Sequence, residues 1–184
     1  KSAAACLKAK RIFTETTALM SMVGYVIGLG DRHPSNIMIQ RDFGNIIHID
    51  FGESFDSAMN RRICPEVVPF RLTTMMINTL EGKDSHGSFM EACELFMGVM
   101  RENHNALSAQ LAIFSDDPVF DREKVLLGNI DFNLNRTIYN KLTGYKTGKN
   151  GDSESVSEQV KRLIEMAENP KNYIKHFPGW CPFW

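Results

Sequence analysis

The chain has 184 residues, of which 43% are hydrophobic, and its formal net charge is −1. This length suits one domain with a single core, and a near-neutral charge without a basic stripe argues against a nucleic-acid partner. The four cysteines lack metal-site spacing and suit reduced thiols, and no apolar run reaches the ~20 residues of a membrane span.

Helical patterns dominate the chain, and one β-hairpin is predicted in its first third. Apolar residues at helical spacing predict a first helix from near Ser2 to Ile27, which ends at Gly28. Two β-branched runs, 36–40 and 45–49, then flank a turn and predict the hairpin. Further helices are expected at about 73–80, 89–103 (with Ser88 as its cap), 105–114, over much of 119–142, and at 156–167, with a linker at 143–155.

Two motifs at the ends of this hairpin indicate phosphoryl transfer. The loop 28–36 contains Asp31 and Asn36, five positions apart, which is the spacing of the base and the metal-binding amide in a kinase catalytic loop. Asp50, Phe51 and Gly52 follow the second strand as the metal-binding tripeptide. The order Asp-Arg-His is the inverse of the common kinase order, but the spacing supports the same chemistry.

The predicted roles follow from the chemistry of each side chain. Asn36 and Asp50 offer the oxygen ligands that Mg²⁺ prefers, and Ile49 is placed with them in the nucleotide site. Asp31 is then available to accept the proton of a substrate hydroxyl. His33 either assists or is itself the base, because imidazole titrates near neutral pH. The sequence alone does not show which of the two residues is the base, and we prefer Asp31 as base and His33 as its partner.

The motif has a nearby counterpart without catalytic context. Asp42, Phe43 and Gly44 form the same tripeptide, but they lie between the two β-branched runs and are interpreted as the hairpin turn. His48 alternates with isoleucines on a strand and is interpreted as a hydrogen-bonded structural residue. The catalytic prediction therefore depends on the conjunction of the loop with the second tripeptide.

The residues 30–36 and 48–52 resemble the phosphoinositide-3-kinase-related kinase superfamily. The last six residues, 179–184, resemble the end of the FATC segment of target of rapamycin (TOR) kinases, and 69–73 and 141–144 are also similar. The resemblance implies an α+β, mainly α fold: the C-terminal lobe of a phosphoinositide-3/4-kinase-like, atypical protein kinase with a helical FATC tail. It divides the chain into 1–118 (C-lobe), 119–151 (C-lobe helices and linker) and 152–184 (FATC).

The implied function is that of a TOR-type Ser/Thr protein kinase in nutrient and growth signalling. Such an enzyme uses Mg-ATP, with Mn²⁺ as an alternative metal. No N-lobe elements precede Asp31, so the chain is expected to be an inactive fragment of a larger kinase. The alternatives are a phosphoinositide lipid kinase and a silent scaffold. A lipid headgroup would favour more basic charge than the activation loop 50–71 carries, and Arg61 and Arg62 are interpreted there as a solvated pair.

The resemblance also implies partners and a location. These are protein substrates, a WD-repeat propeller subunit and a Raptor- or Rictor-type scaffold, in the cytoplasm, with endomembrane attachment and a nuclear pool as alternatives. The aromatic tail from Phe177 to Trp184 is expected to bury its rings against the C-lobe beside the activation loop. Weak membrane contact of this tail is the alternative. Arg32 is expected to orient the catalytic loop.

Overall fold

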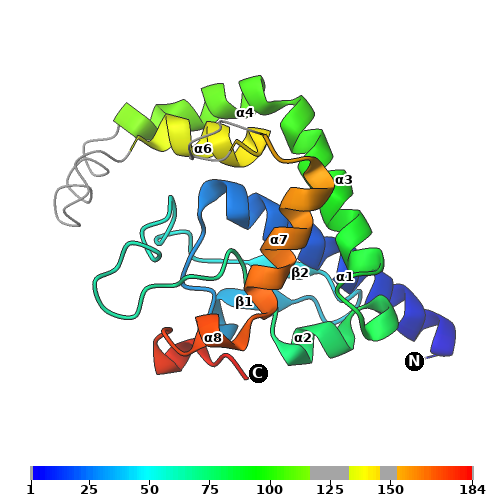
Figure 1. The fold of residues 1–184 in the computed structure, drawn as a ribbon. Helices are drawn as coiled ribbons and strands as arrows, with labels where there is room; N and C mark the ends of the chain where they lie inside the picture. Colours follow the sequence, from blue (N-terminus) through cyan, green and yellow to red (C-terminus); the bar gives the residue numbers. More distant parts are fainter. Residues whose placement is uncertain (1, 117–132, 146–152, 184) are drawn as a thin grey trace.

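The structure is a computed structural model that describes residues 2–116, 133–145 and 153–183. Its fold is mainly helical with one small two-stranded sheet, which confirms the predicted class (Figure 1). The principal elements are α1 (Ala3–Ile27), β1 (Ile37–Ile39), β2 (Ile46–His48), α2 (Thr74–Thr79), α3 (Ser88–Glu102), α4 (His104–Leu111), α6 (Leu134–Thr143), α7 (Val156–Glu168) and α8 (Pro170–Tyr173). No helix among the described residues is long and apolar enough to cross a membrane.

Helix α1 is the centre of the molecule. It begins after Ser2, whose side chain caps the Ala5 N–H, and it ends at Gly28 in the left-handed conformation. Its buried face packs against α3, and α3 packs in turn against α7. The shared core is mainly apolar and contains Phe13, Ala18, Met22, Val26, Phe89, Cys93, Met97, Val160, Leu163, Ile164 and Ala167.

The hairpin lies against α1 and carries the loop residues at its ends. β1 and β2 pair antiparallel, with Met38 opposite Ile47. The Ile46 N–H donates to the Thr16 hydroxyl of α1 at 3.0 Å, which ties the inner strand to the helix. The Asp42-Phe43-Gly44 tripeptide lies in the turn between the strands, as predicted.

The C-terminal helices agree with the predicted pattern within a few residues. α7 begins with a reciprocal capping box between Ser155 and Glu158. One prediction is wrong in detail: α3 starts at Ser88 itself, after Gly87, and no side chain caps it. Of the helical region predicted at 119–142, the part at 134–142 is confirmed as α6, and 119–132 lies outside the described residues.

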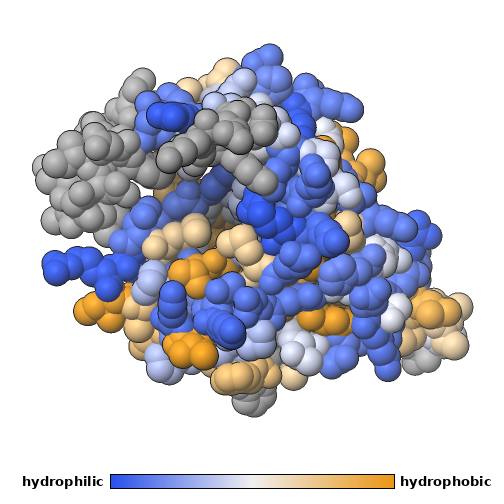
Figure 2. All heavy atoms as spheres, in the orientation of Figure 1, coloured by the Kyte–Doolittle hydropathy of each residue, from blue (hydrophilic) through white to orange (hydrophobic). Residues whose placement is uncertain are grey.

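The surface in Figure 2 is mixed, with hydrophilic residues over much of the face in view and hydrophobic residues in smaller groups between them. Several exposed apolar side chains belong to the outer face of the hairpin and to the C-terminal tail. These two regions flank the catalytic loop in the fold, and they are described with the site below.

Candidate active site

The catalytic loop leaves α1 through two glycines that approach the activation loop closely. Gly28 has φ +60°, and a Cβ there would lie 2.4 Å from the Asp56 backbone nitrogen. A Cβ on Gly30 would lie 2.2 Å from the Ala58 Cβ. Both positions therefore require glycine, because any side chain would push the activation loop away from the catalytic loop.

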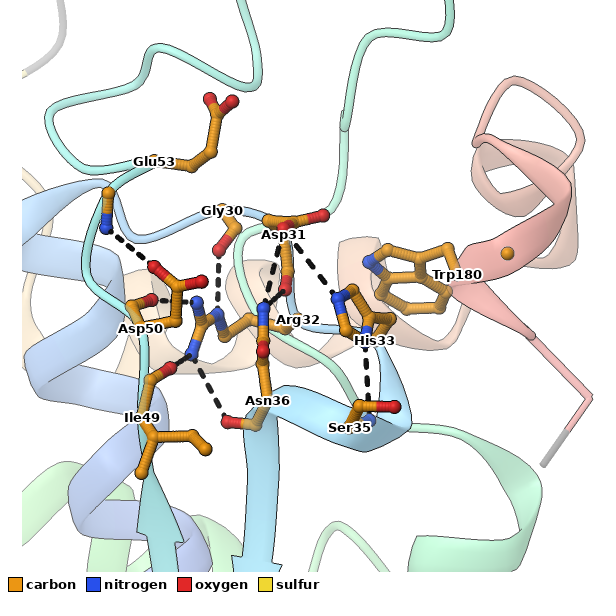
Figure 3. A network of polar contacts seen from close by, with 12 residues as sticks. Gly30, Asp31, Arg32, His33, Ser35, Asn36, Ile49, Asp50, Glu53 and Trp180 are labelled. Carbon is orange, nitrogen blue, oxygen red and sulfur yellow. Dashed lines mark hydrogen bonds and ion pairs between the residues drawn. The ribbon is translucent and has the colours of Figure 1, made fainter.

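Arg32 is buried beneath the loop and holds it to the second strand (Figure 3). Its guanidinium donates to the Gly30 carbonyl at 2.6 Å, to the Ile49 carbonyl at 2.8 Å and to the Asp50 carbonyl at 2.5 Å. Burial lowers the pKa of Arg32, and the neighbouring Asp31 opposes this shift. These bonds agree with the expected orienting role, since one side chain joins both motifs.

Asp31 lies at the centre of the loop's polar contacts. The Asn36 amide nitrogen donates to its backbone carbonyl at 3.0 Å and to its carboxylate at 3.3 Å. The His33 Nε2 lies 3.7 Å from the same carboxylate oxygen. The structure thus brings Asp31, His33 and Asn36 together, and about a third of the Asp31 side chain remains open to solvent.

The hydrogen bonds of His33 indicate which of its nitrogens carries the proton. The Ser35 backbone N–H donates to His33 Nδ1 at 3.2 Å, so Nδ1 acts as the acceptor. In the neutral ring the proton is then on Nε2, the nitrogen that faces Asp31. His33 in this state has a donor at Nε2 and no free acceptor atom, which favours Asp31 as the base.

The two predicted metal ligands lie at the ends of the hairpin. The Ile49 N–H donates to the Asn36 carbonyl at 3.1 Å, so the residues just before and after the strands are paired. The Asn36 amide nitrogen faces Asp31, and its oxygen is the atom suited to a metal ion. Asp50 is exposed, and one of its carboxylate oxygens also accepts from the Gly52 N–H at 3.2 Å.

The oxygens of Asn36 and Asp50 suit a magnesium ion, which takes few ligands from the protein, better than a metal ion whose ligands all come from the protein. The described residues contain no group of three or more His, Cys, Asp or Glu that could hold an ion. One carboxylate and one amide oxygen are the ligand set that Mg²⁺ accepts when phosphates and water complete its shell. Asn36 and Asp50 would therefore hold a metal only together with a phosphorylated ligand.

The outer face of the hairpin adds a candidate site residue, Met38, that the sequence reasoning missed. Ile49, the predicted nucleotide contact, is half-exposed on the same face as Ile47. Met38 lies opposite Ile47 and is 52% exposed. Together they form an apolar surface beside the metal ligands. The signal in the sequence was a methionine on a short apolar strand that begins directly after the catalytic loop.

The activation loop also differs from its sequence interpretation. Arg61 is not a solvated residue: its guanidinium lies 2.7 Å from Glu53 and 3.5 Å from Glu66. Glu66, which sequence reasoning did not single out, is buried and accepts the Asp31 backbone N–H. The interpretation of Arg61 as solvated was wrong because the sequence pattern does not show which acidic side chains the folded loop brings into contact with an arginine.

The C-terminal tail docks beside the activation loop through one ring. Trp180 is 2% exposed, stacks on His176 with centroids 4.6 Å apart, and lies 4.4 Å from the Arg71 guanidinium. Arg71 donates to the Trp180 and Cys181 carbonyls and to the Arg32 carbonyl. The expected burial is wrong for Phe177 and Phe183, which are 61% and 87% exposed.

One buried and one partly buried histidine predict acid sensitivity of the fold. Desolvation, aided by Arg32 and Arg71, lowers the pKa of His48 and His176 to about 4. His48 was expected to be hydrogen-bonded, but its Nδ1 has no partner among the described residues; neither ring nitrogen of His176 has one.

We expect the chain to lose stability as pH falls from the unfolded pKa of about 6.5 towards 4, because the unfolded state then binds protons that the folded state excludes. The loss is about 1.4 kcal/mol per pH unit for each histidine in that window. Thermal unfolding at pH 7.5 and 5.5 measures it. His176→Gln should reduce this pH dependence, and His86→Gln, on an exposed loop, should not. An unchanged slope in His176→Gln would contradict the assignment.

Comparison with known proteins identifies the family of this site. A family model described as phosphatidylinositol 3- and 4-kinase matches residues 1–124, and a FATC domain model matches residues 153–184. The chain belongs to the phosphatidylinositol 3- and 4-kinase family. The division of the chain at 118 and 151 stays a prediction.

The relatives of this phosphatidylinositol 3- and 4-kinase family chain include TOR kinases. Over its whole length, the chain is 34% identical to the serine/threonine-protein kinase tor1 of Schizosaccharomyces pombe, and the match covers 10% of that protein. It is 36% identical, again over its whole length, to the serine/threonine-protein kinase TOR2 of Saccharomyces cerevisiae, and this match covers 9% of that protein. Among solved structures, the FAT and kinase domain of CtTel1 superposes with a TM-score of 0.78 at 29% identity, over 96% of this chain and 12% of that one.

Proposed function

We propose that this chain is the C-lobe and FATC tail of a TOR-type Ser/Thr protein kinase that transfers the γ-phosphate of Mg-ATP to protein hydroxyls. The chain spans about a tenth of the length of the curated relatives it matches. The observation that carries the proposal is the contact set around Asp31, in which Asn36 bonds the candidate base while Arg32 joins its loop to Asp50.

In the proposed reaction the substrate hydroxyl oxygen bonds to the γ-phosphorus, and the bond from that phosphorus to the bridging oxygen breaks to release ADP. Asp31 takes the hydroxyl proton. His33, protonated on Nε2, donates towards Asp31 or a phosphate oxygen. A magnesium ion on Asn36 and Asp50 would supply positive charge to the phosphates, and Mn²⁺ would suit the same oxygens. Met38, Ile47 and Ile49 would contact the adenine.

The activation loop supports a protein acceptor over a phosphoinositide. A polyphosphorylated headgroup needs several available cations. Arg61 is already bound by Glu53 and Glu66, and Lys141 forms a buried ion pair with Asp56 at 2.6 Å. Arg61 and Lys141 therefore hold the loop itself, and the exposed Arg62 is a single cation where such a headgroup needs several.

The proposal extends to partners and location. A WD-repeat propeller and a Raptor- or Rictor-type scaffold are the partners that the TOR resemblance implies, in nutrient and growth signalling. The cytoplasm is the proposed site of action, with endomembranes and the nucleus as secondary locations. The exposed Phe177 and Phe183 support a weak membrane contact of the tail.

The decisive experiment gives the native full-length protein labelled ATP and magnesium with a protein substrate and phosphoinositide vesicles side by side. We expect label on protein, and a loss of about 1,000-fold in the Asp50→Ala variant, the scale of removing one charge-stabilising group from a preorganised site. Asp42→Ala is the matched control, since it changes the same tripeptide in the hairpin turn and should leave the rate unchanged. Label on lipid would move the protein to the lipid kinases, and no label would favour a scaffold.

A further inference from the structure

The backbone of Asp31 makes a contact that the catalytic motif itself does not explain. Its N–H donates to both carboxylate oxygens of Glu66, at 2.9 and 3.0 Å, across 35 positions of the chain. Glu66 lies near the end of the activation loop and is 5% exposed. Both oxygens of this buried carboxylate therefore accept the same backbone N–H of the candidate base.

Asp31 needs such a contact because its backbone is in a sparsely populated conformation. Its φ is +57°, in the left-handed region that side chains other than glycine rarely adopt. A residue keeps a strained backbone conformation of this kind only where contacts with the surrounding structure hold it there. A hydrogen bond from a backbone N–H to an ionised carboxylate is about twice as strong as one between neutral groups, so Glu66 is well suited to hold the strained residue.

Glu66 is itself fixed from several sides. Its backbone N–H donates to the Ala58 carbonyl at 3.1 Å, and Arg61 lies 3.5 Å from its carboxylate. Burial raises the pKa of Glu66, while the Asp31 N–H and Arg61 oppose that shift. The carboxylate is thus held between the catalytic loop and the activation loop.

We infer that Glu66 is a positioning residue for Asp31, which holds the base in its left-handed conformation and makes its placement depend on the folded activation loop. This inference rests on the proposed kinase function. The bonds of Glu66 go to Asp31, Arg61 and Ala58, whereas Ile49 and Asp50 are held by Arg32. Its loss should therefore displace the base while the contacts that hold Ile49 and Asp50 in the proposed ATP site are kept.

The test compares kcat and the KM for ATP in full-length Glu66→Ala and Glu66→Gln. We expect kcat to fall about 100-fold in the alanine variant with KM for ATP unchanged, the scale of a 1 Å misplacement of a catalytic group. Glutamine keeps an acceptor oxygen without the charge and should recover about 10-fold of that loss. Recovery by glutamine is a result that a simple loss of folding would not give.

Glu53→Gln is the matched control. Its side chain bonds the same Arg61 at 2.7 Å, and in Figure 3 it points away from Asp31. It should leave kcat within about 2-fold of wild type. Equal losses in Glu53→Gln and Glu66→Gln, an unchanged kcat in Glu66→Ala, or a KM change without a kcat change would each overturn the inference.

The two proposals fail in different ways. If the wild-type protein transfers no label to protein substrates, the proposed function is wrong before Glu66 is tested. If the wild type is active and Asp50→Ala is not, while Glu66→Ala keeps the wild-type kcat, only the positioning role is wrong. Should Glu66→Ala fail to fold, the comparison of Glu66→Gln with Glu53→Gln decides the inference alone.

Discussion

Asp31→Asn in the full-length enzyme is expected to lower kcat by about 1,000-fold at saturating Mg-ATP, within the range that general base catalysis contributes. Asparagine keeps the size of the side chain but cannot take the proton of the substrate hydroxyl. The backbone bond to Glu66 and the loop geometry should survive, because that bond uses the Asp31 N–H. Steady-state rates with a protein substrate measure the effect, and the KM for ATP should change little.

His33→Ala separates the two candidates for the base. We expect only about a 10-fold fall in kcat, because His33 Nδ1 already accepts the Ser35 N–H and Nε2 then carries a proton. The ring is a donor beside Asp31 in this arrangement. If His33→Ala loses as much activity as Asp31→Asn while Asp31→Asn keeps a substantial rate, the roles are reversed and imidazole is the base.

The sequence predicted the site best where its geometry is local. The spacing of Asp31 and Asn36, and their position before a strand, follow from chain order within one short loop. The turn at Asp42 could be separated from the motif at Asp50 because Asp42 lies between two β-branched runs, whereas Asp50 follows the second run and comes after the loop 28–36. Helix α7 was predictable for the same reason, since its cap and apolar stripe lie within thirteen residues.

Contacts between distant segments could not be predicted in this way. Glu66 and Asp31 are 35 positions apart, and Arg71 reaches the Trp180 carbonyl across 109. No periodicity connects such pairs, since they depend on how the activation loop folds back over α1. The same limit explains the errors at Arg61 and Phe177: an alternating or charged pattern shows which side chains favour burial, but not which ones find a partner.

Trp180→Ala is expected to destabilise the chain by about 3–5 kcal/mol, the usual cost of truncating a buried aromatic ring. The indole is enclosed by His176, Tyr173 and Arg71, so its removal leaves a cavity rather than an open surface. Thermal unfolding measures the loss. Phe183→Ala is the matched control, because this ring is 87% exposed in the same tail and its loss should cost less than about 0.5 kcal/mol.

The same pair of variants separates bracing of the active site from membrane contact. Arg71 donates to the Trp180 carbonyl at 2.6 Å and to the Arg32 carbonyl at 3.3 Å, so one buried cation connects the docked tail to the catalytic loop. Loss of the Trp180 ring, or deletion of residues 179–184, should therefore abolish kinase activity on a soluble substrate, and Phe183→Ala should not. Vesicle binding of Phe183→Ala is the second measurement. If this variant keeps its activity on the soluble substrate but no longer binds vesicles, the tail serves both purposes: its buried ring supports the catalytic loop, while its exposed ring contacts lipid.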